Sequence, residues 1–414
     1  MKKMLAIALF ASFMFGSGSN AAAKSLEEIL KEKGIISEED YKEATQKNDL
    51  AYYEPGKGIT VESRDGKYKA HVGGRLQARY TFTDFDQQGA DDVSDFTIRR
   101  MKVWLQGHVF SKNLKYKWQH NFGGGNQVLE DAYLSYTFRE PLSLTLGQFK
   151  PPQGRQELTS SGSQLFVDRS LANETFNLGY DIGTMADGHF ANHLVEYMVG
   201  VFNGNGVNKS NKGNDHLVSG RIDLNPLGQF KMDEAAWPEE KPLLNLGASY
   251  AWEKMTAADA GSSIDTANDV LDVALNLDGL NAATFAAAFG NELEWDVWTA
   301  NLHAKWLGAA LAAEYYSLNA EPDLGDDWDA DGYYVQAGYQ VIPKTLELAV
   351  RYSEIDSTDT NAAVRFDKSE TQFGINYYLA KHNAKLQADY TAVSDDLNDD
   401  RDDDLFRLQA QVIF

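Results

Sequence analysis

Positively charged side chains recur at alternate positions in three segments of this chain. They form three pairs: Arg75 and Arg79, Arg100 and Lys102, and Lys115 and Lys117. Because successive side chains of an extended strand point to opposite faces, both members of a pair would lie on one face. Ammonium and guanidinium groups that face a water-filled space concentrate anions and donate charge-assisted hydrogen bonds to oxyanions. The spacing therefore predicts an anion-binding surface carried by strands.

The sequence around the first pair has the period of two that such strands need. Between Tyr68 and Phe82 the even positions are apolar or small and most odd positions are polar. Aromatic residues stand near both ends of this run, as they do in membrane-spanning barrel strands. The run from Phe406 to Phe414 alternates in the same way, with Arg407 on its polar face. Both runs favour strands with one lipid-facing and one water-facing side.

We expect about sixteen such strands and an all-β fold, a transmembrane antiparallel β-barrel. Short turns alternate with longer loops, as in bacterial outer-membrane barrels. The predicted turns are Ser111–Asn113, Arg139–Pro141, Pro343–Lys344 and Lys381–Asn383. An even number of strands would place both ends of the chain on the periplasmic side.

The N-terminal region divides into two parts ahead of the barrel. Residues 1–23 have the basic start, apolar core and Ala21-Ala22-Ala23 site of a cleaved signal peptide. Residues 24–57 would form a short helical segment and linker, with Gly34 between two helices and Ser37 to Asp40 as a capping box. This segment would serve either as a periplasmic appendage or as an oligomerising module. Residues 58–414 would form the barrel, because no later apolar stretch reaches the length of about 18 residues that a spanning helix needs.

Composition excludes several functional classes. The chain has no Cys, which excludes disulfides, thiol catalysis and Cys-ligated metal centres. The net charge of −23 argues against a nucleic-acid partner. The eight His form no nucleophile–base or metal-ligand spacing, so we predict no enzyme activity, no cofactor and no metal site. Most acidic side chains lie in the predicted outer loops. Because ions in solution screen charges over about 8 Å, these side chains would have little effect on the potential in a lumen below them.

The long connection from Lys150 to Tyr180 and the predicted strands around it carry a series of recognisable motifs. The stretches concerned are Phe96 to Val103 (FTIRRMKV), Gly147 to Pro151 (GQFKP), Glu157 to Ser160 (ELTS), Asp168 to Ser170 (DRS), Asp181 to Gly183 (DIG) and Gly200 to Gly204 (GVFNG). In this order they resemble the signature of the phosphate-selective porin O and P family, over about residues 58–414.

The resemblance implies a sixteen-stranded, trimeric outer-membrane barrel whose third loop narrows the lumen. It also implies lumen arginines and a lysine-bearing constriction that passes phosphate. The paired arginines correspond to Arg99 and Arg100, and the cations of the third loop are Lys150, Arg155 and Arg169. For Arg169 a structural pair with Asp168 or a neighbouring acid is the alternative. For Arg99, strand alternation points outward, which predicts a place at the rim.

The predicted function is passive diffusion of small hydrophilic solutes, biased to inorganic anions such as phosphate. The alternatives are a general porin without anion selectivity and a barrel that sheathes a partner protein. Regular inward arginines become fewer in the later strands, and the rim is acidic, both of which weaken the case for phosphate. The connection from Glu253 to Asn291 has helix-like stretches at Thr266–Asn276 and Leu280–Ala288, which would cover the mouth or lie on the surface.

Overall fold

The computed structural model describes residues 30–37, 39–40, 51–86, 91–125, 127–211, 213–257, 274–275, 277, 280–358, 365–397 and 402–414. The chain divides into two units, residues 1–50 and 51–414. In the first unit, a helical turn at residues 30–32 ends before Gly34, whose φ is 65°. Ser37 and Asp40 exchange two hydrogen bonds of 3.0 Å between side chain and backbone, as the predicted capping box requires. The predicted signal peptide and the remainder of both helices lie outside the described residues.

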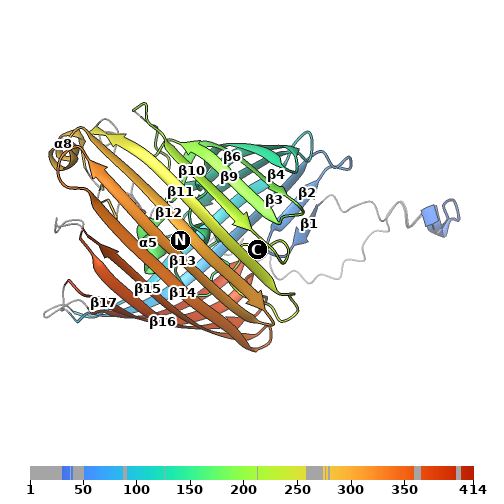
Figure 1. The fold of residues 1–414 in the computed structure, drawn as a ribbon. Helices are drawn as coiled ribbons and strands as arrows, with labels where there is room; N and C mark the ends of the chain where they lie inside the picture. The colour runs from blue at the N-terminus through green and yellow to red at the C-terminus, as the bar shows by residue number, and fades with distance from the viewer. Residues whose placement is uncertain are drawn as a thin grey trace, which may run out of the picture. The chain divides into compact units, whose positions relative to one another are not determined.

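The second unit is a closed antiparallel barrel of sixteen strands in the described part of the chain, which confirms the predicted fold (Figure 1). The strands are β3 (Lys69–Asp84), β4 (Val93–His108), β5 (Leu114–Asn121), β6 (Val128–Arg139), β7 (Leu142–Phe149), β8 (Asp181–Phe190), β9 (Val195–Phe202), β10 (Leu217–Leu224), β11 (Leu243–Thr256), β12 (Glu292–Trp306), β13 (Ala309–Pro322), β14 (Trp328–Ile342), β15 (Leu346–Ser357), β16 (Asp367–Tyr378), β17 (Ala384–Asp395) and β18 (Asp404–Ile413). One end of the barrel carries the short connections and is called the turn end. The other is the loop end.

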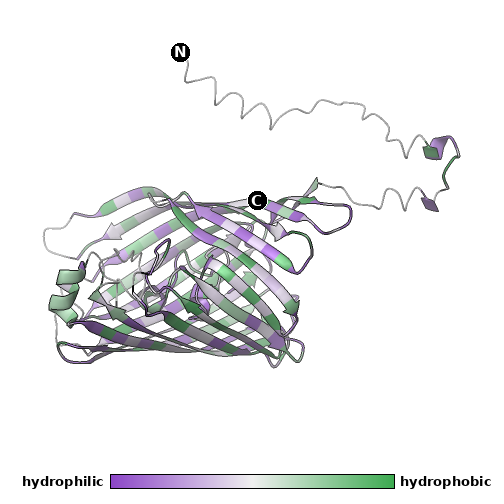
Figure 2. Cartoon of the chain, turned by 90° about the horizontal axis from the view of Figure 1, so that it is seen from above, coloured by the Kyte–Doolittle hydropathy of each residue, from purple (hydrophilic) through white to green (hydrophobic). Residues whose placement is uncertain are grey.

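Hydrophobic and hydrophilic residues alternate along the barrel strands (Figure 2). Leu146, Phe373 and Leu386 on the outer surface are half exposed or more, whereas Gln372 and Lys385 on the inner side are buried. An apolar exterior around a polar interior is the pattern of a barrel that sits in lipid. Among the described residues, no helix is long and apolar enough to span a membrane.

A two-stranded hairpin that the sequence did not indicate precedes the barrel. β1 (Ala51–Glu54) pairs with β2 (Gly58–Glu62), and β2 pairs with the start of β3 at the turn end. The compact unit that contains the barrel extends from Ala51 to Phe414 and includes this hairpin.

The barrel closes where β18 pairs with β3. Gln77 lies opposite Gln411, and Gly74 and Phe414 exchange backbone hydrogen bonds of 2.7 and 2.9 Å. A Cβ at Gly74 would lie 2.8 Å from the Phe414 ring, so a larger residue there would displace that ring.

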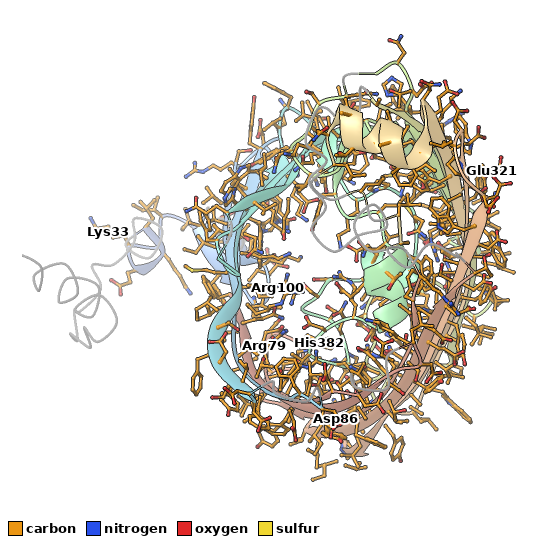
Figure 3. The ribbon with its side chains drawn as sticks, turned by 90° about the vertical axis from the view of Figure 1, so that its left-hand side faces the viewer. Lys33, Arg79, Asp86, Arg100, Glu321 and His382 are labelled. Atoms are coloured by element: carbon orange, nitrogen blue, oxygen red, sulfur yellow. The ribbon has the colours of Figure 1, made fainter. Side chains whose placement is uncertain are left out.

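The connection at residues 150–180, here called the inserted loop, folds into the barrel and carries α4 (Arg155–Leu158) and α5 (Leu171–Phe176). Ser170 caps α5 by accepting a hydrogen bond from the Asn173 N–H. α5 packs on β13, β14 and β15, where the Phe176 ring stacks on Tyr316 with centroids 5.7 Å apart. Figure 3 shows α5 inside the barrel on the side opposite the strand that carries Arg100.

Two further connections differ from simple loops. The stretch before β12 contains α8 (Ala282–Phe289), which confirms the helix predicted near Leu280–Ala288, while most of Thr266–Asn276 lies outside the described residues. At the turn end, residues 225–242, here called the turn-end segment, bring buried Ala235, Ala236 and Trp237 against the inner side of the barrel.

Candidate functional site

A polar cavity of about 1810 Å³ occupies the side of the barrel formed by β3 to β9. The inserted loop forms its opposite wall, with Ser160, Ser161 and Ser163 among the lining residues. Eight of the ten predicted cations line this cavity: Arg75, Arg99, Arg100, Lys102, Lys115, Lys117, Lys150 and Arg169. Five of these eight, Arg75, Arg100, Lys102, Lys115 and Lys117, are the strand cations that the period of two places on one face.

Two of the strand cations are paired with carboxylates of β6. Lys102 Nζ lies 2.6 Å from Glu130 Oε1, and Lys117 Nζ lies 2.8 Å from Asp131 Oδ2. Glu130 is the extra residue where the β5–β6 register shifts between Gln119 and His120, and both carboxylates line the cavity. Strict alternation places two adjacent residues on opposite faces, so the sequence could not show both acids inside.

The orientation of Arg99 differs from the outward one expected from the sequence. Alternation along β4 pointed it outward, but the β3–β4 register shifts so that Gln77 faces Arg100 and Ala78 faces Ile98, leaving Arg99 as a bulge residue. The bulge turns Arg99 inward beside Arg100, and its Nε lies 3.8 Å from Asp168 Oδ1. Arg99 and Arg100, although adjacent in the sequence, therefore both line the larger cavity.

Asp168 of the inserted loop lies among four guanidinium groups. Arg79 donates to both of its oxygens, at 2.6 and 3.0 Å, and Arg100 and Arg407 approach to 3.4 and 3.6 Å. Burial alone would raise the pKa of Asp168, but Arg79, Arg99 and Arg100 hold it well below its ordinary value. One carboxylate thus anchors the loop and leaves excess positive charge around it.

Arg79 lines a second, smaller cavity of about 580 Å³ toward the loop end of β3 and β4. Arg99 lines both cavities, and its side chain keeps about a third of its surface exposed (35%). Arg99 therefore stands where an anion entering from the loop end would pass into the larger space. Figure 3 shows the Arg79 and Arg100 side chains on the inner side of the barrel.

The cations of the inserted loop have different surroundings. Lys150 pairs with Glu157, and burial, with Arg169 nearby, lowers the pKa of Lys150 to about 8. Arg169 also pairs with Glu157, at 3.0 Å, and donates to the backbone oxygens of Gln156, Glu157 and Thr159. Arg169 therefore forms a structural ion pair with a neighbouring acid, which was the alternative given above, and that acid is Glu157 and not Asp168.

Arg155 is absent from the linings of both cavities. It is 1% exposed, and its guanidinium lies 3.4 Å from Asp223 and over the Phe230 ring at 4.9 Å. This position, between the inserted loop and the inner side of the barrel, makes it a packing and anchoring residue.

Arg75 is the buried strand cation with the simplest partners. Its Nη1 and Nη2 each donate a hydrogen bond of 2.9 Å, to the hydroxyls of Ser160 and Ser161 respectively. In the described part of the chain no carboxylate lies within ion-pairing distance of it, and its Nε has no hydrogen-bond partner. A guanidinium beside loop hydroxyls at the cavity surface has the chemistry to receive a small oxyanion.

Comparison with known proteins identifies the fold and family. A model of the family described as phosphate-selective porin O and P matches residues 71–414. The chain belongs to this family. It is 26% identical to Porin O of Pseudomonas aeruginosa over 418 residues, covering 86% of this chain and 91% of that protein.

Solved structures agree with the barrel of this porin. An anion-selective porin from Comamonas acidovorans matches with a TM-score of 0.56 at 12% identity, covering 83% of this chain and 99% of that one. OmpT of Vibrio cholerae in its trimer form matches with a TM-score of 0.53 at 12% identity and the same coverage. The protein is an outer-membrane porin.

Most carboxylates of this porin's lumen were not predicted from the sequence. Among the described residues, nine Lys or Arg and seven Asp or Glu line the larger cavity. Glu130 and Asp131 were hidden by the bulge, and Glu157 and Asp168 lie in a loop without periodicity. The family motifs that contain Glu157 and Asp168 could have indicated both, because each contributes an acid beside a loop cation.

Proposed function

We propose that this porin carries small inorganic anions, with a preference for oxyanions such as phosphate. The observation that supports this most is Arg75, a buried guanidinium at the cavity surface whose direct partners are the hydroxyls of Ser160 and Ser161. A guanidinium fork fits two oxygens of one phosphate, and neighbouring hydroxyls supply further donors. The family description and the anion-selective porin from Comamonas acidovorans point the same way.

The balance of charge makes the proposed preference moderate. Carboxylates neutralise Lys102, Lys117 and Lys150 locally. The excess of cations over acids in the lining is small, which supports diffusion of several anions rather than strict selection of one. A general porin without anion selectivity is the second candidate for the same reason.

The remaining proposals concern assembly and location. We propose that residues 1–23 are removed on export and that three barrels associate in the outer membrane, as the OmpT structure does in its trimer form. For the barrel itself, we propose residues 58–414 as the permeation domain, with β1 paired to β2 at its turn end.

Purified protein in a planar bilayer tests the proposed selectivity. Under a KCl gradient the reversal potential is expected to show chloride preference, and added phosphate is expected to reduce the chloride current by occupying the Arg75 site. Equal permeability to potassium and chloride with no effect of phosphate would favour the general porin. A preference for potassium contradicts the proposal.

A further inference from the structure

The turn-end segment, residues 225–242, reaches inward to the inserted loop. It joins β10 to β11 at an end of the barrel where other connections, such as residues 140–141 and 307–308, are tight turns. Met232 of this segment lines the larger cavity together with Ser163 of the inserted loop. The two insertions, which enter from opposite ends, therefore meet at the surface of the permeation space.

Glu234 makes the contact between them. Its side chain is 3% exposed, and its two oxygens accept hydrogen bonds from the Leu165 backbone N–H at 2.8 Å and from Gln156 Nε2 at 3.0 Å. Its own backbone N–H donates to the Ser163 carbonyl at 2.9 Å. One buried carboxylate thus holds both the outgoing and the returning part of the inserted loop, through hydrogen bonds of the strong, charge-assisted kind.

The segment is itself fixed to the strands on the far side of the barrel. Asp233 pairs with Lys305 of β12, and Gln340 of β14 donates to the Ala236 carbonyl at 2.8 Å. Trp237 packs edge-on against Tyr378, with ring centroids 5.1 Å apart. These anchors hold the turn-end segment so that Glu234 is presented at a fixed place.

The loop residues that Glu234 holds are close in sequence to those that bind Arg75. Ser163 lies two and three residues from Ser161 and Ser160, whose hydroxyls accept from Arg75. Gln411 Nε2 also donates to the Gly162 carbonyl between them, at 2.9 Å. Ser163 and the hydroxyls that bind Arg75 thus belong to one short stretch of the inserted loop.

We infer that Glu234 is a positioning residue for the constriction, and that the turn-end segment sets the width of the channel by bracing the inserted loop from the periplasmic side. The effect on channel width stands alone, whereas the effect on anion preference rests on the proposed function.

The test compares Glu234→Ala with Glu239→Ala in planar bilayers. Glu239 lies on the same segment but is exposed and pairs with Lys344 and Lys381, so it is a matched change of charge without contact to the loop. Glu234→Ala is expected to raise the unitary conductance about twofold, add subconductance steps and lower the chloride-to-potassium permeability ratio. Glu239→Ala is expected to match the parent protein. Equal conductance in the two variants overturns the inference.

A reversible cross-link keeps the test decisive if Glu234→Ala fails to fold. The chain has no Cys, so the pair Ser163→Cys and Glu234→Cys would form a single defined disulfide between two backbones already joined by a hydrogen bond. The oxidised pair should have the parent conductance, and reduction in the bilayer should raise it. No change on reduction contradicts the bracing role. If reduction changes the conductance but the channel shows no anion preference, the bracing role of Glu234 is supported and only the proposed function is refuted.

Discussion

The two sides of the barrel use the same sequence pattern for different purposes. On the near side, β3 to β9, most inward charged residues face the cavity, although Arg79 binds Asp168 of the inserted loop. On the far side, β10 to β18, they face the inserted loop and the turn-end segment. What an inward cation does is therefore decided by what lies opposite it, water or protein.

The far-side cations show this clearly. Lys385 donates to the Gln164 carbonyl at 2.8 Å, and Arg351 donates to the carbonyls of Asp168 and Arg169 at 3.1 and 2.9 Å. Both side chains are essentially buried, at 1% and 0% exposure, and neither lines either of the two cavities described above. The scarcity of regular inward arginines in the later strands follows from this: these strands hold the loop and do not extend the anion path.

The largest expected effect comes from breaking a far-side pair. Arg407→Ala would leave Asp389, which is 2% exposed, without its guanidinium at 2.7 Å. Loss of one partner from a buried ion pair costs about 3–5 kcal/mol of unfolding free energy. Urea unfolding of the barrel refolded in micelles measures this. Lys117→Ala, which removes a more exposed near-side pair, should cost clearly less, and equal losses would remove the distinction between the two sides.

Next in size is the loss of the Arg75 site. Arg75→Gln removes hydrogen bonds from a charged donor, each worth about 1.5–3 kcal/mol, or roughly a 10- to 100-fold change in affinity. The phosphate concentration that halves the chloride current should rise by that factor, while the barrel remains folded. Lys112→Gln, on an exposed turn, is the matched loss of charge and should have no effect. An unchanged phosphate response in Arg75→Gln would move the anion site elsewhere.

A smaller effect is expected from pH. Because burial lowers the pKa of Lys150 to about 8, this amine is charged at pH 6 and loses its charge as the pH rises through 8. Chloride preference should therefore be fully present at pH 6 and decline between pH 7 and 9. Lys150→Arg keeps its charge throughout this range and should remove the decline. A decline that persists in this variant assigns the pH dependence to another group.

The smallest effect is expected at Lys115, an exposed cation of the near side. Lys115→Ala should reduce chloride conductance at low salt and have no effect near 1 M, where the Debye length is about 3 Å. Conductance measured at 0.05 M and 1 M KCl checks this. An effect of equal size at both concentrations would indicate direct contact with the permeating ion.

Local pattern was sufficient to predict the strands but not their interior partners. All sixteen barrel strands and most near-side cations follow from alternation, because a period of two and the turn residues are properties of neighbouring positions. The bulges at Arg99 and Glu130 could not be predicted this way, since an inserted residue changes the facing without changing the composition. The contact of Glu234 with the inserted loop joins residues about 70 positions apart, which a local pattern does not show. The unusual length of the turn-end segment was the one local sign that it differs from a tight turn.

The pairing of β3 with β18 ties part of the arginine cluster to closure of the barrel. β3 carries Arg75 and Arg79, and Arg79 is held in part by Gln409 of β18, with 3.1 Å between Arg79 Nη2 and Gln409 Oε1. Until β18 pairs with it, β3 has an edge that is free beyond the stretch bound to β2, and Arg79 lacks its Gln409 partner. A free edge invites pairing with other chains. A circularly permuted chain, opened at an outer loop and joined across the turn end, would separate these events: it should form the same lumen while β3 and β18 become neighbours early in synthesis.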